Sequence, residues 1–91
     1  MNDSRDIAVR DGWVDAAPAG FEVALSVSRL RHGVIIEVIA QDTRPAPGAI
    51  GHSLTPGRII NRAHIGPGAL FARVTGARDE DRAILAVSAW K

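Results

Sequence analysis

Two stretches of the sequence decide the fold: FEVALSVS at residues 21–28 and VIIEVIA at residues 34–40. In the first stretch apolar residues alternate with small or polar ones, which is the period-two pattern of a half-buried β-strand. The second stretch is rich in β-branched residues, which favour strands, and it is largely apolar on both faces. Arg31-His32-Gly33 lies between them as a tight turn, so the two stretches are predicted to pair as a β-hairpin.

Further strands are predicted between glycine and proline breakers. Four windows carry a strand pattern, at residues 50–54, 58–63, 69–75 and 83–90. The breakers are the loop Asp42–Gly48, Pro56-Gly57, Gly66-Pro67-Gly68 and the acidic segment Arg78–Asp81, which we interpret as an exposed hairpin loop. No window carries a helical stripe of convincing length with cap signals. The sequence therefore predicts an all-β fold, a small antiparallel β-sandwich or barrel of six to eight short strands.

The first residues differ in composition from the rest. Residues 1–19 are polar, charged and rich in small side chains, a composition that does not build a core alone. We expect them to form an extended N-terminal arm on a domain of residues 20–91, with a short strand at Ile7–Val9 as a further option. Trp13 and Val14 interrupt the polar segment and are predicted to anchor it on the body of the domain.

Composition excludes several classes of protein. The chain has 91 residues, which supports one core and one domain. Its net charge of +1 argues against a dedicated nucleic-acid binder, and the lack of cysteine excludes disulfides and thiolate metal sites. The sequence shows neither a signal peptide nor a membrane span. Ten of its eleven basic residues are arginine, which is either the imprint of a GC-rich genome or a sign of protein interfaces.

No catalytic, cofactor or metal site is predicted, and the protein is expected not to be an enzyme. His32, His52 and His64 have no compact metal-ligand spacing. A triad of Ser53, His52 and Asp42 is disfavoured because neighbours on a strand point to opposite faces. The acidic segment at residues 79–81 lacks the rest of a calcium-binding loop.

Two predicted strands, Val34–Ala40 and Ala83–Trp90, are apolar on both faces. A sandwich strand normally needs only one apolar face, so the second face of each must be covered. The candidates for this cover are the N-terminal segment, a loop or another copy of the protein. For this reason we expect a homo-oligomer or a docked partner.

Three segments carry a resemblance to a known class of protein: GHSLTPG at residues 51–57, GALFAR at residues 68–73 and AILAV at residues 83–87. They resemble small β-structured virion proteins encoded among the head and tail genes of tailed bacteriophages. In these proteins a G-H-x-L-x-P-G turn precedes a strand ending in L-(F/W/Y)-A-R, and a valine-rich strand follows. The resemblance covers residues 20–90, and its motifs are short and degenerate.

The resemblance implies a non-enzymatic virion protein that decorates or cements the capsid, or forms a spike or tail component. Its implied partners are the major capsid protein or another virion protein and further copies of itself, with a trimer favoured and with no nucleic acid, membrane or cofactor. The hypothetical interface residues are Arg5, Arg10, Trp13, Arg58, Arg62 and Arg73. The alternatives are a tail or fibre component that contacts a receptor and a carbohydrate-binding, lectin-like module, in which Trp13 or Trp90 would be an exposed platform.

Overall fold

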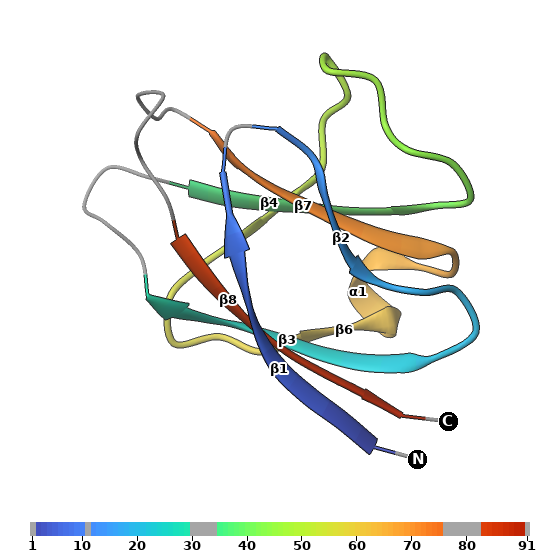
Figure 1. The fold of residues 1–91 in the computed structure, drawn as a ribbon, viewed down its shortest axis with the longest axis vertical. Helices are drawn as coiled ribbons and strands as arrows, with labels where there is room; N and C mark the ends of the chain where they lie inside the picture. Colours follow the sequence, from blue (N-terminus) through green and yellow to red (C-terminus); the bar gives the residue numbers. More distant parts are fainter. Residues whose placement is uncertain (1, 11, 30–34, 76–82, 91) are drawn as a thin grey trace.

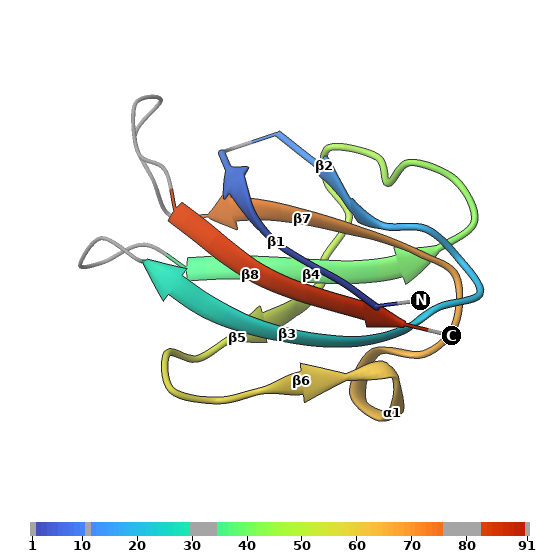
Figure 2. The same ribbon diagram turned by 60° about the horizontal axis from the view of Figure 1, so that its bottom comes forward.

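The computed structural model describes residues 2–10, 12–29, 35–75 and 83–90 (Figure 1). Its elements are β1 (Asn2–Val9), β2 (Val14–Ala17), β3 (Glu22–Arg29), β4 (Ile35–Gln41), β5 (His52–Leu54), β6 (Ile60–Asn61), α1 (Arg62–Ile65), β7 (Ala69–Thr75) and β8 (Ala83–Trp90). The strands form two four-stranded sheets, with the orders β1-β8-β3-β6 and β2-β7-β4-β5. Every strand pairing is antiparallel, and the sheets pack face to face (Figure 2). The predicted all-β antiparallel sandwich is therefore confirmed.

The predicted pairing of the two deciding stretches is wrong. β3 and β4 belong to opposite sheets, where β3 pairs with β8 and β6, and β4 pairs with β7 and β5. β7 and β8, expected to flank a hairpin loop, are likewise in different sheets. A period of two identifies a strand and its inward face but carries no information about its partner. The turns predicted at residues 31–33 and 78–81 lie outside the described residues.

The core lies between the two sheets and follows the predicted alternation. Its largest fully buried side chains are Val9, Val23, Leu25, Ile36, Val38, Leu70, Val74 and Leu85. Along β8 the buried residues alternate with half-buried ones, beginning with buried Ala83. Each buried aliphatic side chain of this kind contributes roughly 1.5–3 kcal/mol. The packing of these inward faces fixes the two sheets, and therefore fixes where the side chains on their outward faces lie.

The N-terminal residues enter the sheets instead of projecting as an arm. β1 pairs with β8 along its whole length, from Asn2 opposite Trp90 to Val9 opposite Ala83. β2 pairs with β7 in the other sheet, so residues 2–17 supply one edge strand to each sheet. The segment is polar on average, but Val9 and Ala16 are completely buried. A strand at the edge of a sheet needs only this sparse apolar contact because its backbone is held by the ladder.

A single helical turn replaces part of the strand predicted at residues 58–63. After the two-residue β6, Asn61 caps α1: its Oδ1 accepts from the backbone N–H of Ala63 at 3.0 Å. The Nδ1 of His64 in turn accepts from the Asn61 N–H at 3.2 Å, which completes a capping box. A four-residue helix carries no periodic stripe, which explains why the sequence pattern missed it. No helix in the described ranges is long and apolar enough to cross a membrane.

Candidate functional site

An ion pair on the outer face of the β2-β7-β4-β5 sheet is the starting point of the candidate site. Glu37 on β4 lies directly opposite Arg73 on β7. The Oε1 atom of Glu37 accepts a hydrogen bond from Nε of Arg73 at 3.1 Å and lies 3.1 Å from Nη2 in the ion pair. Only 12% of the Glu37 side chain and 15% of the Arg73 side chain are exposed. An ion pair this sheltered stabilises a fold only if its remaining polar atoms are also hydrogen-bonded.

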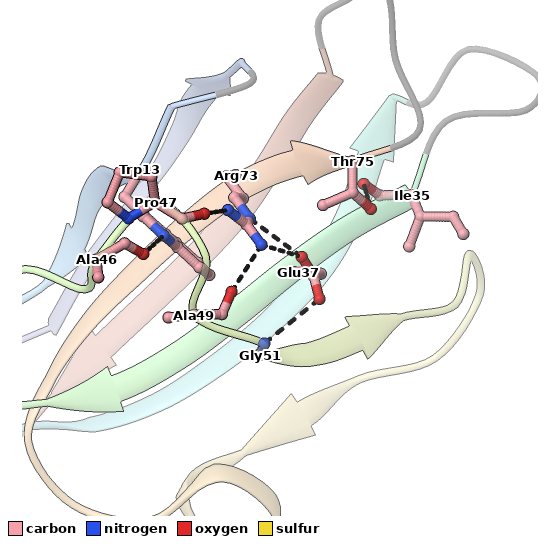
Figure 3. A network of polar contacts seen from close by, with 9 residues as sticks. All are labelled: Trp13, Ile35, Glu37, Ala46, Pro47, Ala49, Gly51, Arg73 and Thr75. Atoms are coloured by element: carbon pink, nitrogen blue, oxygen red, sulfur yellow. Dashed lines mark hydrogen bonds and ion pairs between the residues drawn. The ribbon is translucent and has the colours of Figure 1, made fainter.

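The loop formed by residues 42–51 provides those partners (Figure 3). Arg73 donates through Nη1 to the carbonyl of Pro47 and through Nη2 to the carbonyl of Ala49, the latter at 2.7 Å. The Oε2 atom of Glu37 accepts from the backbone N–H of Gly51 at 3.3 Å. The ion pair therefore fastens the loop to the outer face of the sheet.

Trp13 completes this arrangement from the N-terminal side. Its residue is only 7% exposed, and the guanidinium of Arg73 lies over its ring at 4.4 Å from the centroid. The indole Nε1 donates to the carbonyl of Ala46 at 3.1 Å, so the ring is held from both the strand and the loop. Trp13, Glu37, Arg73 and loop 42–51 together are called the loop clamp below. The prediction that Trp13 anchors the N-terminal segment on the domain is confirmed.

Arg44 adds a more exposed contact to the same region. It donates through Nη1 to the backbone carbonyl of Trp13 and lies 5.7 Å from the ring centroid of Phe71. It also forms an ion pair with Asp15 at 3.5 Å, but the two side chains are 58% and 79% exposed. Such a pair is screened by water and contributes about 0–1 kcal/mol. The buried contacts of Arg73 therefore dominate the clamp.

Gly51 is required where the loop meets β4. A Cβ atom at this position would lie 2.5 Å from the carbonyl oxygen of Val38 and 3.4 Å from the Trp13 ring. By contrast, a Cβ atom at Gly48 in the same loop would meet nothing within 4 Å. The close approach at Gly51 lets its N–H reach Glu37, so one end of the loop depends on glycine for its contact with the sheet.

A second arginine braces the opposite side of the domain. Arg62 of α1 donates to the carbonyls of Phe21 at 2.8 Å, of Gly68 at 2.5 Å and of both Gly66 and Pro18 at 3.2 Å. These bonds tie the segment before β3 to the turn before β7. They border an open depression of about 800 Å³ that Phe21, Glu22 and Pro67 also line.

The structure divides the six predicted interface residues into two groups. The exposed group is Arg5, Arg10 and Arg58, and the group engaged within the chain is Trp13, Arg62 and Arg73. Arg5 still donates from Nη2 to the carbonyl of Ala16 at 3.2 Å. Trp13 is too deeply covered to serve as a glycan platform, whereas Trp90 is 36% exposed.

Glu37 is the functional residue that the sequence interpretation missed. It is an acidic side chain in the middle of an apolar strand, on a face with Ile35 and Ile39. Arg73 occupies the matching outward position of β7. A single charge on an otherwise apolar face, with an opposite charge on another strand, is the signal that would have indicated a buried pair.

The histidines stay separate from the loop clamp. His52 on β5 and His64 on α1 are both exposed, and His32 is outside the described residues. Among the residues that the structure describes, no group of three or more His, Asp or Glu side chains is placed to hold a metal ion. Comparisons of the chain with models of protein families, with curated proteins and with solved structures found no match. The fold itself defines the class of the protein, a small antiparallel β-sandwich.

Proposed function

We propose that this protein is a non-enzymatic structural subunit of a larger protein assembly, and that the assembly is the virion of a tailed bacteriophage. In this proposal the chain decorates or cements the capsid through protein–protein contacts. The resemblance of residues 51–57, 68–73 and 83–87 to small β-structured virion proteins supports the choice of assembly. The loop clamp supports the structural role, for the following reason.

The observation that carries the proposal is an apolar side chain held on a braced loop. Ile50 is 84% exposed, although its neighbours Ala49 and Gly51 are fastened to Arg73 and Glu37. The loop is therefore ordered before any partner arrives, which lowers the entropy lost on binding. A rigidly presented apolar anchor is the usual centre of a protein interface. Ile35 on β4 and Ile59 before β6 are also exposed, at 47% and 65%.

The test is incorporation into particles produced from the genome that encodes the chain. We expect the protein in purified particles at a fixed ratio to the capsid protein, measured by quantitative mass spectrometry. Ile50→Asp should reduce incorporation at least tenfold and leave the melting temperature of the free protein unchanged, because the side chain is almost fully solvated. Ile59→Asp is the matched control on a segment outside the loop clamp. Absence of the wild-type protein from the particles would refute the virion role.

A carbohydrate-binding function is the second candidate, and Trp90 favours it. Trp90 is 36% exposed and lies opposite exposed Glu22 in the β3–β8 ladder, so an aromatic ring and a carboxylate share one face. Aromatic stacking beside hydrogen-bonding groups is the usual chemistry of sugar recognition. This function predicts a sugar-dependent rise in melting temperature that Trp90→Ala abolishes. A melting temperature that no mono- or oligosaccharide of a broad panel raises would argue against it.

A further inference from the structure

The two sheets of the sandwich have edges of very different kinds. Three of the four edge strands are short: β6 has two residues, β5 has three, and β2 has four with a register shift against β7. β1 is the exception, with eight residues paired to β8 without a register shift. Natural sandwiches usually shorten, bulge or cover their edges because an open edge offers unpaired N–H and C=O groups. β1 does not follow this rule.

We propose that β1 pairs antiparallel with β1 of a second copy about a two-fold axis. The two β1-β8-β3-β6 sheets would then join into one continuous sheet of eight strands, twice the four of a single copy. Figure 2 shows β1 beside β8 at the edge of its sheet, and Ser4, Arg5, Asp6 and Ala8 along it are exposed. Backbone hydrogen bonds between the two edges would satisfy the groups that β1 leaves unpaired in one copy.

The charges of β1 fit a second copy as the partner and favour one register over its neighbours. A two-fold axis normal to the sheet keeps the inward faces of both copies on the same side. The axis must therefore pass midway between one residue of β1 and the same residue of the second copy. Centring on Arg5 or on Asp6 would oppose two like charges. Centring on Ser4 places Arg5 opposite Asp3 of the second copy, and this happens twice in the dimer. Opposite charges facing each other across an antiparallel pair are favourable and like charges are not.

The side chains beside the axis allow the two edges to meet. On the outer face the row Ala24, Ser88 and Ser4 consists of small residues, and the two hydroxyls are 3.1 Å apart. Arg5 turns inward to the carbonyl of Ala16, so its side chain does not shield the edge. A guanidinium has five N–H groups, which leaves donors for an acidic residue across the interface.

Cysteine cross-linking tests both the pairing and its register, because the chain has no cysteine of its own. Ser4→Cys places a thiol at the axis, where facing Cα atoms of an antiparallel pair lie about 4.5–5.5 Å apart, within disulfide range. Under mild oxidation we expect a covalent dimer for most of the protein. Ala8→Cys, on the same face of β1 but away from the axis, is the control and should stay monomeric on a non-reducing gel. Cross-linking at Ala8 instead of Ser4 would overturn the proposed register.

Sedimentation equilibrium of the unmodified protein provides the second measurement. We expect a reversible dimer of twice 9.6 kDa. Arg5→Asp should weaken dimerisation at least tenfold, and adding Asp3→Arg should restore it, which a merely structural role of Arg5 would not explain. Circular dichroism establishes that each variant is folded. A monomer at every concentration, a trimer, or a double variant that remains dissociated would overturn the proposal.

The experiments can refute the pairing of β1 and the proposed virion role independently of each other. The cross-linking and sedimentation measurements use the purified chain alone, so they report only on the β1 edge. A dimer that is absent from particles would refute the virion role and support the pairing. A chain that is monomeric in solution but present at a fixed ratio in particles would refute the pairing and support the virion role.

Discussion

Each sheet of the sandwich has a strand with apolar residues on its outer face, and the two outer faces differ in whether the chain covers them. On the β2-β7-β4-β5 sheet, loop 42–51 and Trp13 cover the outer face of β4 around Glu37 through the loop clamp, while Ile35 at the start of the strand stays 47% exposed. On the β1-β8-β3-β6 sheet, β8 shows half-buried Ile84, Ala86 and Ser88 outward and no loop is fastened over them among the described residues. An apolar face with large side chains therefore receives a cover from its own chain. The outer face of β8, which carries Ala86 and Ser88 between Ile84 and Trp90, is left open, since covering alanine and serine gains little apolar area.

The comparison also corrects the reason for expecting an oligomer. The two doubly apolar strands predict a cover from the N-terminal segment, a loop or another copy of the protein, and this is the reason for expecting a homo-oligomer or a docked partner. For β4, the chain provides it with a loop and an N-terminal residue, two of the three candidate covers. The case for a second copy now depends on the open edge of β1.

The largest expected difference between the faces is between their tryptophans. Trp13→Ala should lower the free energy of unfolding by about 3–5 kcal/mol, because it empties a buried site and removes the support of Arg73. Trp90→Ala, on the open face, should lower it by about 1 kcal/mol or less. Urea denaturation followed by circular dichroism measures both. Equal losses would show that the two faces do not differ as described.

Removal of the clamp's cation should have the next largest effect. Arg73→Met leaves Glu37 sheltered without its partner and takes donors from the carbonyls of Pro47 and Ala49, so we expect a loss of about 3 kcal/mol. Arg58→Met, at an exposed position, is the control and should change stability by at most about 0.5 kcal/mol. A small effect at Arg73 would mean that the loop is held by packing alone.

Two glycine substitutions in loop 42–51 distinguish the effect of the close contact with β4 from the effect of the loop's backbone flexibility. Gly51→Ala should destabilise the fold by about 1–3 kcal/mol, because the new Cβ meets the Val38 carbonyl oxygen. Gly48→Ala lies in the same loop and meets nothing, so it should be neutral within about 0.5 kcal/mol or slightly stabilising. Thermal unfolding of the two variants under identical conditions gives the comparison. Similar losses for both would point to loop entropy.

The smallest effect is expected on the open face. Ser88→Ala removes only an exposed hydroxyl contact to Ser4 at 3.1 Å, and the free energy of unfolding should change by less than about 0.5 kcal/mol. Urea titration at low protein concentration, below the range of self-association, provides the measurement. A loss above about 1 kcal/mol would reveal that this face contributes more than its exposure indicates.

Strand positions and inward faces could be predicted from the sequence, because alternation is a local property. The windows at residues 69–75 and 83–90 match β7 and β8, and the stretches at 21–28 and 34–40 match β3 and β4 within a residue or so at each end. Strand partners could not be predicted, since both hairpins proposed from turn signals join strands of opposite sheets. Connections that cross between sheets use the same glycines and charged residues as tight hairpins do.

The candidate site was only half visible in the sequence. The sequence predicts Trp13 as an anchor and, from its charge and its place beside a motif, Arg73 as an interface residue. Its actual partners, Glu37 and the carbonyls of the loop, are 36, 26 and 24 residues away in sequence. A backbone carbonyl has no signature in the amino-acid sequence, so an arginine that binds carbonyls looks the same as one on a surface.

The position of β8 has a consequence for how the sandwich is made. β8 follows every other described strand in the sequence, yet it lies inside its sheet, between β1 and β3. During synthesis the ladders of β1 and β3 with β8 therefore form only after β8 has been made. Contacts such as Asn2 with Trp90 close nearly the whole described chain and are slow to form. The β2-β7-β4-β5 sheet needs no residue beyond β7, so it is free to assemble first and to serve as the surface on which the other sheet completes the fold.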